Sequence, residues 1–243
     1  MDAERLALVR ALQRQRRGAL GSRQMLWQLR RRGHPVGRHQ TRRLMREAGA
    51  ACRQRRRFRA TTDSNHGQPV AANLLDRGLD VSEPNTAWCA DITAIWTLQG
   101  WLHLAAVLDL ADRQVVGWAM AEHMRGELVE QALEMAIGRR RPPPGLLHHS
   151  DRGSQYASGD YRELLATHSL RASMSRKGNC WDNAVMERFF GTLKSEWCDP
   201  QRYPSPEDAR RDIIVFIEMV YNSDRGHSTL GDLTPRERVQ AVA

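Results

Sequence analysis

Short apolar runs alternate with brief breaks through the middle of the chain, beginning at Trp88. The runs cover residues 88–96, 101–110 and 114–121, and a few turn-forming residues separate each run from the next. Runs of this length, bounded by such breaks, are typical of β-strands joined as hairpins. The pattern therefore predicts three antiparallel strands in succession.

After residue 121 the pattern changes to an alternation of helical and strand-like segments. The predicted elements are a helix over 126–139, a strand over Leu146–His149, a helix over 158–167, a strand over 170–174 and a helix over 181–197. Three antiparallel strands followed by this alternation are the order expected of an α/β, ribonuclease-H-like fold, in which helices flank a mixed sheet. A further amphipathic helix over 206–222 precedes a tail that we expect to be irregular.

The beginning of the chain has a purely helical pattern. Apolar residues recur at helical spacing from Gly21 to Arg32, and a second helix is predicted over 38–48. Two short helices joined by a glycine-containing turn predict a small all-α helix-turn-helix domain within residues 1–60. An ordinary helical hairpin with solvent-facing arginines is the alternative interpretation.

The remaining domain boundaries follow from where these patterns stop. Residues 61–86 lack a sustained period and contain Gly, Pro, Asn and Asp throughout, which is typical of a linker. The predicted core then covers residues 87–200. Its C-terminal helix and tail are expected to occupy residues 201–243.

Charge is distributed unevenly between these parts. The chain has 37 Lys and Arg against 28 Asp and Glu, a net charge of +9. Residues 1–60 hold 18 Arg and three acidic residues, a net charge of +15, so the rest of the chain carries −6. A segment this basic neutralises phosphates and binds DNA in a salt-dependent way without reading its sequence. A solvated, disordered basic tail is the alternative.

Cysteine usage and hydropathy narrow the cellular setting. The four cysteines, at positions 52, 89, 180 and 198, include no closely spaced pair of the kind that a structural zinc site requires, so we expect no zinc. They fit a reducing compartment. No signal peptide opens the chain, and no apolar run is long enough to span a bilayer. We therefore expect a cytoplasmic protein that has no membrane partner.

Three acidic residues are candidate metal ligands. Asp91 lies inside an apolar run, where an unpaired carboxylate is costly. Asp151 follows a predicted strand, at the kind of strand end where ligand groups collect. Glu187 lies on the predicted helix over 181–197, largely opposite the apolar face of that helix. Taken singly, each has a plain alternative: a solvent-facing strand Asp, a turn Asp and an exposed helix Glu.

Their combination is more specific, because 35 residues separate Asp151 from Glu187 and distinctive motifs surround all three acids. The motifs are W-x-x-DIT around Asp91, GWLHLAAVLDLADRQVVGW, HSDRGSQYAS, SMSRKGNCWDNAVMERFFGTLKSE and YNSDRGHSTLGDLTP. With them the chain resembles the OrfB-type transposases of bacterial insertion sequences, the IS3 family, which have a retroviral-integrase-like core. The resemblance covers roughly residues 20–238.

The resemblance implies a DDE transposase, a polynucleotidyl transferase that cleaves and joins DNA strands. Asp91, Asp151 and Glu187 would be both the catalytic residues and the ligands of two Mg²⁺ or Mn²⁺ ions, with Asp91 shared between the ions. Hard oxygen ligands suit either metal. In the family mechanism, water attacks at the end of the element, and the freed 3′ hydroxyl then attacks target DNA.

DNA contacts are expected from residues around the helix over 181–197 and from arginines of the helix over 38–48. These residues are Asn183, Lys177, Lys194, Arg38, Arg42, Arg43 and Arg46. Lys194 falls on the same helix face as Glu187, close to where the cleaved end would lie. The expected partners are double-stranded DNA with terminal inverted repeats, target DNA, an OrfA-type product of a partner reading frame, and further copies of the chain assembled on DNA. A bacterial, nucleoid-associated location follows from the same resemblance.

Two other functional hypotheses remain open. A DNA-binding regulator or catalytically silent subunit would bind element ends through the N-terminal domain and use the core only for assembly. A ribonuclease-H-like nuclease for RNA–DNA hybrids would explain the core but neither the basic helix-turn-helix nor the C-terminal motif. Outside the acids, we expect buried core aromatics rather than base-stacking ones, and a structural or DNA-backbone role for a group of C-terminal polar residues. The aromatic residues are Trp181 and Trp197. The C-terminal polar residues are Tyr221, Asn222, Arg225 and His227.

Overall fold

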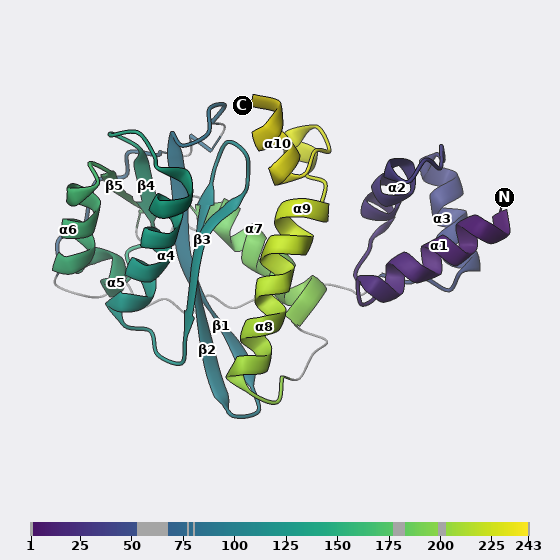
Figure 1. The fold of residues 1–243 in the computed structure, drawn as a ribbon, viewed down its shortest axis with the longest axis horizontal. Coiled ribbons are helices and arrows are strands. Elements are labelled where there is room, and N and C mark those ends of the chain that lie inside the picture. Colours follow the sequence, from purple (N-terminus) through teal and green to yellow (C-terminus); the bar gives the residue numbers. More distant parts are fainter. Residues whose placement is uncertain are drawn as a thin grey trace.

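The computed structural model describes residues 2–52, 68–76, 78–79, 81–176, 183–198 and 203–242. Helices cover both faces of a five-stranded sheet, and a separate group of three helices lies to one side (Figure 1). Within the described residues, no helix is both long and apolar enough to cross a bilayer.

The sheet is mixed and has the order β3-β2-β1-β4-β5. Its strands are β1 Ala87–Thr97, β2 Gly100–Asp109, β3 Val115–Ala121, β4 Leu147–Ser150 and β5 Arg171–Met174. The first three strands pair antiparallel as successive hairpins, whereas β4 runs parallel to β1 and β5 parallel to β4. All five predicted strands are present, and each boundary lies within one residue of its predicted position.

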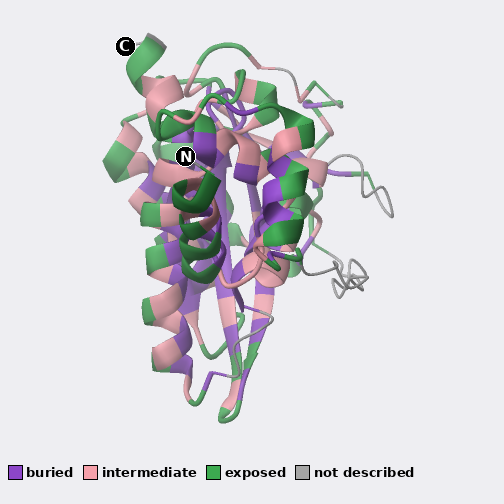
Figure 2. Ribbon diagram, turned by 90° about the vertical axis from the view of Figure 1, so that its right-hand side faces the viewer, coloured by how far each residue is buried: buried purple, intermediate pink, exposed green. Residues whose placement is uncertain are grey.

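Different helices pack on the two faces of the sheet (Figures 1 and 2). On one face lie α4 Gly126–Arg140, α5 Ser154–Ala157 and α6 Gly159–Thr167, and on the other lie α7 Ala184–Thr192 and α8 Pro206–Val215. Side chains alternate along a strand, so Trp88 and Ala90 of β1 join the first apolar cluster while Cys89 and Ile95 join the second. The sheet is therefore buried on both faces, as its long apolar runs require.

One glycine allows helix α4 to approach the sheet closely. A Cβ atom added to Gly117 of β3 would lie 2.1 Å from the backbone oxygen of Ala132 in α4. Because that obstacle is backbone rather than a flexible side chain, only glycine fits at this position.

Two of the predicted long helices are partly wider helices of the π type. After α7 the chain continues as a π-helical segment over Leu193–Cys198, and after α8 as another over Phe216–Tyr221, followed by the short α9 Asn222–Asp224. The prediction of a regular helix over 206–222 is therefore correct in extent but not in geometry. Residues 181–182, where the other helix was expected to begin, lie outside the described residues.

The tail after residue 224 is more regular than predicted. It forms a single 3₁₀ turn over Ser228–Leu230 and a helix, α10, over Pro235–Val242. The backbone N–H of Thr234 donates to Glu237 Oε2 at 2.9 Å, and the N–H of Glu237 donates to Thr234 Oγ1 at 3.2 Å. This reciprocal capping box begins the helix, and its Thr-x-x-Glu signature was present in the sequence.

The N-terminal domain contains three helices: α1 Asp2–Gln15, α2 Ser22–Arg31 and α3 Arg38–Glu47. The second and third are the predicted pair, but no element was predicted for α1. Val9 and Leu12 of α1 complete a small apolar cluster with Met25, Leu29 and Leu44 of the other two helices. Two short helices alone cannot enclose a core, which is why a third one packs on them. The basic run over 53–59 lies outside the described residues.

The described residues between 68 and 86 form no helix or strand, but they pack on the sheet. Leu75 is buried in the apolar cluster beneath α7 and α8. The backbone N–H groups of Leu74 and Leu75 both donate to Ser173 Oγ of β5, at 2.9 and 3.3 Å. This part of the predicted linker is thus attached to the edge of the sheet.

Candidate active site

Asp91 lies in the middle of β1, on the face of the sheet that α7 covers. It is two residues from Cys89 and four from Ile95, both of which point into the cluster under α7, so the alternation of the strand directs Asp91 to the same side. The carboxylate is half-buried, and its Oδ1 accepts a hydrogen bond of 2.7 Å from the backbone N–H of Ile92. Asp91 is therefore not a solvent-facing strand residue.

Asp151 follows directly after β4, beside Asp91. The last paired residues of the two parallel strands are Cys89 and His149, and Asp91 and Asp151 each lie two residues further along. Asp151 also closes a turn, because its Oδ1 accepts a hydrogen bond of 2.9 Å from the N–H of Gly153. Parallel pairing thus brings together two carboxylates that are far apart in the sequence.

Glu187 comes from α7, in the turn of the helix next to β1. Met186, Phe189 and Phe190 of α7 are buried against the sheet, whereas Glu187 is exposed on another side of the helix. At the start of the helix, the side-chain amide of Asn183 donates to the backbone oxygen of Ala90, 3.4 Å away. This bond fixes the end of α7 one residue from Asp91.

Electrostatics shows that the three acids act on one another. Burial, the charge of Asp151 and, more weakly, the charge of Glu187 raise the pKa of Asp91 well above its ordinary value. The hydrogen bond from Ile92 and the charge of Lys194 act in the opposite direction. Burial also raises the pKa of Glu187. Two carboxylates that disfavour the ionisation of a third form surroundings that are suited to a cation.

The donor chemistry of this site suits a hard divalent metal. All three side chains offer carboxylate oxygens, the ligand type that Mg²⁺ and Mn²⁺ prefer. In the part of the chain that the structure describes, no three His, Cys, Asp or Glu side chains are already close enough to form a complete metal shell. The charges of Asp151 and Glu187 nevertheless reach Asp91.

Tyr156 is a neighbour of the acids that the sequence did not single out. It lies on α5 and is buried, and its hydroxyl has no hydrogen-bond partner among the described residues. Burial and the neighbouring Tyr161, with smaller effects of Asp91 and Asp151, raise the pKa of Tyr156 well above its usual range. A neutral O–H group thus lies in the field of both aspartates. Its signal in the sequence is the aromatic residue within HSDRGSQYAS.

The residues expected to contact DNA are distributed over two regions. On α3, Arg38, Arg42 and Arg46 are exposed, whereas Arg43 forms ion pairs with Asp2 at 3.1 Å and Glu47 at 3.6 Å. Near the acids, Lys194 is half-buried and Asn183 is buried, which gives Asn183 a structural role in addition to any contact with DNA. Lys177 and Trp181 lie outside the described residues.

Trp197 and the C-terminal polar residues have structural contacts. Trp197 is buried in the core, as expected. The amide of Asn222 accepts from the N–H of Val115 and donates to its carbonyl, both at 3.0 Å, and so pairs with the beginning of β3. Tyr221 is buried against Phe189 of α7, with the ring centroids 4.8 Å apart.

Models of known protein families match three parts of the chain. Residues 81–180 match one model described as an integrase core domain, and residues 168–235 match a second model with the same description. Residues 2–58 match a model described as an HTH-like domain.

Curated proteins that resemble the chain come from bacterial insertion sequences. The chain is 46% identical over 230 residues to the "Insertion element IS600 uncharacterized 31 kDa protein" of Shigella sonnei, an alignment that covers 93% of this chain and 85% of that protein. It is 41% identical over 210 residues to "Transposase InsF for insertion sequence IS3A" of Escherichia coli strain K12, covering 86% of this chain and 73% of that one.

Solved structures with a similar fold are viral integrases. A chain of the simian T-cell lymphotropic virus intasome in complex with PP2A regulatory subunit B56 gamma has a TM-score of 0.54 at 17% identity, and the match covers 84% of this chain and 67% of that one. The HTLV-2 integrase catalytic core domain in complex with magnesium has a TM-score of 0.50 at 16% identity, with 65% and 97% covered. The predicted ribonuclease-H-like integrase fold and the helix-turn-helix region are both confirmed.

Proposed function

Because the chain belongs to the IS3 family of insertion-sequence transposases, we propose that it cleaves DNA at the 3′ ends of its element and joins them to target DNA, using Asp91, Asp151 and Glu187. The observation that supports this proposal is that Asp151, at the end of β4, follows the residues that pair with β1 beside Asp91, while Glu187 lies on the helix that begins next to Asp91. The charges of Asp151 and Glu187 act on the half-buried Asp91.

Asp91, Asp151 and Glu187 would together hold two Mg²⁺ or Mn²⁺ ions. Bound ions supply charge stabilisation for the attacking and leaving oxygens of the phosphoryl transfer. The raised pKa of Asp91 supports this, because neighbouring carboxylates need a cation before all of them can be ionised together. That a viral integrase core of similar fold was solved in complex with magnesium points in the same direction.

Two transfers would use this one site. In the first, water attacks the phosphorus at the element end, forming one P–O bond and breaking the bond to the 3′ oxygen, which leaves as a hydroxyl. In the second, that 3′ hydroxyl attacks a phosphorus of target DNA and displaces a 3′ oxygen of the target. In the first transfer an oxygen from water replaces the 3′ oxygen on phosphorus, and in the second the 3′ oxygen of the element replaces that of the target. Neither transfer needs a covalent bond to the protein.

The residues around the acids would position the DNA strand. Lys194 lies close enough for its charge to lower the pKa of Asp91, and its ammonium group would contact a phosphate near the cleaved end. Lys177 and Asn183 would contribute to the same region. Arg38, Arg42 and Arg46, with Arg43 more weakly, would bind the backbone of the terminal inverted repeat.

Assembly extends the proposal beyond a single chain. Joining two element ends to one target requires two sites, so we expect several copies of the chain on DNA. The product of an OrfA-type partner frame would contribute to recognition of the element. The reaction would take place in the bacterial cytoplasm, on the nucleoid.

The test compares the parent protein with Asp151→Asn on duplexes that carry the terminal inverted repeat. With Mg²⁺ or Mn²⁺, the parent is expected to nick at the repeat and join the 3′ end to another strand. The variant should bind the same DNA and lose cutting by at least about 10²- to 10³-fold, the scale seen when a group that stabilises transition-state charge is removed. Strand-cleavage gels and gel-shift titrations measure the two effects.

Asp160→Asn is the matched control, because Asp160 is exposed in the first turn of α6, and it should cut like the parent. The assignment of the triad is falsified if Asp151→Asn cuts as fast as Asp160→Asn. A parent protein that binds the repeat but never cuts it would instead favour the regulator or silent-subunit hypothesis.

A further inference from the structure

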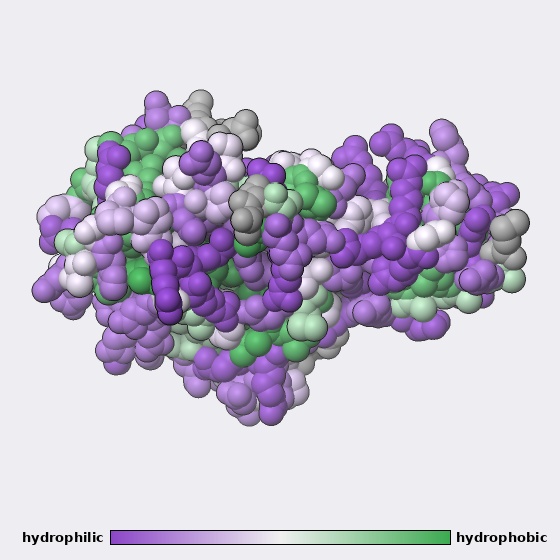
Figure 3. All heavy atoms as spheres, turned by 45° about the horizontal axis from the view of Figure 1, so that its top comes forward, coloured by the Kyte–Doolittle hydropathy of each residue, from purple (hydrophilic) through white to green (hydrophobic). Residues whose placement is uncertain are grey.

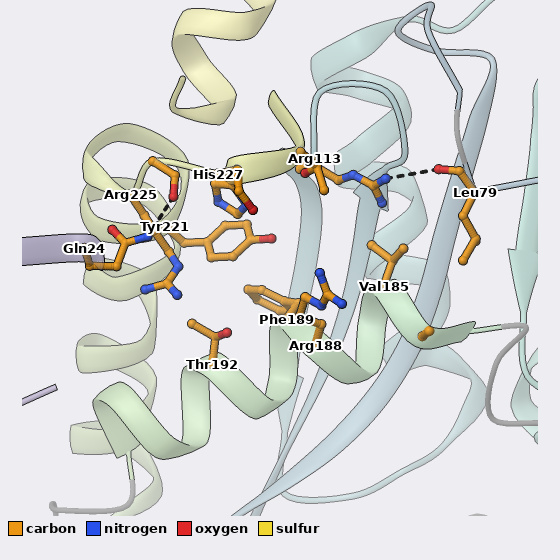
Figure 4. A pocket seen from close by; sticks show the side chains of 14 residues that line it. Gln24, Leu79, Arg113, Val185, Arg188, Phe189, Thr192, Tyr221, Arg225 and His227 are labelled. Atoms are coloured by element: carbon orange, nitrogen blue, oxygen red, sulfur yellow. Dashed lines mark hydrogen bonds between the residues drawn. The ribbon is translucent and has the colours of Figure 1, made fainter. Parts of the chain in front are cut away.

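A cavity of about 280 Å³ lies on the side of α7 that faces the C-terminal segment (Figure 4). Arg188 and Thr192 of α7 line one wall of it. Arg225 and His227 of the C-terminal segment line another, and Arg113, between β2 and β3, lies at one end. Ligand pockets for drug-sized molecules usually measure about 300–1,000 Å³, so this one suits a smaller group.

Among the described residues, three arginines and no carboxylate line the cavity. Arg225 forms a bidentate ion pair with Glu196, and Arg113 donates to the backbone oxygen of Leu79 at 3.0 Å. For Arg188, which is exposed, no hydrogen bond or ion pair was found among the described residues. Arg188 thus brings to the cavity a guanidinium charge that no described residue pairs with.

The imidazole of His227 lies in the positive potential of the arginines that line this cavity. Its Nε2 is buried and has no hydrogen-bond partner among the described residues. Burial and the charges of Arg225, Arg113 and Arg188 lower its pKa to about 3. A neutral imidazole can offer an N–H to an anion, and an anion among three guanidinium groups would remove the repulsion that these groups exert on one another.

The geometry of the donors favours a phosphate. Arg188 and Thr192 are four residues apart on α7, so they project from the same side of the helix and offer a guanidinium fork and a hydroxyl together. Guanidinium groups match the oxygens of a phosphate bidentately. The cavity would hold one phosphate and part of its sugar but not a whole nucleotide chain, whose neighbouring units would remain outside.

We propose that this pocket binds one backbone phosphate of the DNA strand that is held at the active site, and so fixes the strand beside Glu187. Arg188 follows Glu187 directly, so a strand seated in the pocket would pass from the cationic side of α7 to its acidic side. The inference rests on the proposed function for the identity of the ligand, but anion binding by the pocket can be measured without any cutting.

The test uses the full chain with ¹³C-labelled histidines and follows the His227 resonance by NMR, assigned by its absence in His227→Gln. Inorganic phosphate and then a short single-stranded oligonucleotide are titrated. Both should shift the His227 resonance in the parent, and neither should shift it in Arg188→Gln. The exposed Arg171→Gln on β5 removes the same charge far along the sheet, and its His227 resonance should respond like that of the parent.

DNA affinity gives a second, independent measurement. Arg188→Gln should weaken oligonucleotide binding about three- to tenfold and reduce the slope of log K against log salt by about one, as expected for one lost phosphate contact. Arg171→Gln should change neither quantity. The proposal is overturned if the two variants behave alike, or if DNA binds without moving the His227 resonance.

Two further outcomes separate this inference from the proposed function. If phosphate shifts the resonance and the oligonucleotide does not, the pocket binds a free anion and its assignment to DNA is wrong. If the parent never cuts DNA while the oligonucleotide still moves the His227 resonance, the proposed function fails and the pocket stands.

Discussion

The N-terminal domain and the core differ in how they are stabilised and in where their charges lie. Among the described residues, the N-terminal domain buries nine apolar residues in a single cluster between three helices, whereas the core buries apolar residues on both faces of its sheet. A helical unit of roughly 50–60 residues with so small a core is marginal by itself. On the face of the N-terminal domain that Figure 3 turns toward the viewer, most residues are hydrophilic.

Polar bonds attach the N-terminal domain to the C-terminal segment of the core. Arg17 forms a bidentate ion pair with Asp212, at 2.6 and 2.8 Å, and its guanidinium lies 3.8 Å from the ring centre of Trp197. Arg16 pairs with Asp224, and Gln24 Nε2 donates to the backbone oxygen of Gly226 at 2.8 Å. Under the proposed function, the arginines of the N-terminal domain would bind DNA while the acids of the core carry out strand chemistry, and the contacts that join the two units can be broken one at a time by mutation.

The largest effect is expected from removing charge at the centre of the core. Asp91→Asn should abolish cutting while changing DNA affinity little, because the arginines of the N-terminal domain are untouched. Without metal it should also raise the melting temperature, since it removes a half-buried carboxylate that Asp151 and Glu187 disfavour. Each kcal/mol gained corresponds to about 2–4 °C for a chain of this size. Thermal unfolding with and without Mg²⁺ measures these melting temperatures. Mg²⁺ should raise the melting temperature of the parent and leave that of the variant unchanged.

The pH dependence of the same variant sharpens this prediction. A carboxyl group whose folded pKa lies above its unfolded value makes the folded state bind more protons, so stability falls as the pH rises from about 4 through the raised folded pKa. The metal-free parent should show this decline and Asp91→Asn should lack it. Identical pH profiles would mean that Asp91 is not held among like charges.

The second effect tests the N-terminal domain. Replacing Arg38, Arg42 and Arg46 together by Gln should reduce the salt slope of DNA binding by roughly two to three, because each phosphate contact contributes about 0.9. The loss in cutting should appear in the DNA concentration that gives half the maximal rate. The single variant Arg43→Gln should weaken binding less than Arg42→Gln, because Asp2 and Glu47 already engage Arg43. Equal effects of the two would mean that the ion pairs with Asp2 and Glu47 do not keep Arg43 from DNA.

Sequence patterns predicted the core well because its elements carry strong local signals. The apolar runs of β1 to β3 and the apolar face of α7 could be recognised without any tertiary information. The importance of Asp91, by contrast, came from the resemblance to a family. The pairing of Asp91 with Asp151 depends on the register of two parallel strands that a helix and two other strands separate, and a sequence pattern does not specify that register.

The parts that could not be predicted depend on contacts between distant residues. Helix α1 has a weak apolar period of its own, and it is fixed by packing on α2 and α3 and by Arg16 and Arg17 at its C-terminal end. The partners of those two arginines lie about two hundred residues away in the sequence. The π-helical segments after α7 and α8 contain neither glycine nor proline, so no helix-breaking residue in the sequence marked them.

The smallest effect is expected at the contact between the two regions. Gly226 packs against Trp27 of α2, and a Cβ atom at this position would lie 2.5 Å from Cε2 of the indole ring. Gly226→Ala should therefore push α2 away from the C-terminal segment and weaken its attachment by about 1–3 kcal/mol, the usual cost of overpacking. Hydrogen exchange of the α2 amides should become faster, while the core strands keep their protection.

A second substitution decides whether this effect comes from the contact itself. Trp27→Leu in the Gly226→Ala background makes room for the added methyl group and should slow the exchange of α2 again, towards the rate of Trp27→Leu alone. Cutting by Gly226→Ala should fall only a few-fold, because the acids and the DNA-binding arginines remain intact. If exchange of α2 is unchanged in Gly226→Ala, the N-terminal domain does not depend on this attachment, and the division of labour between the two regions needs no fixed contact between them.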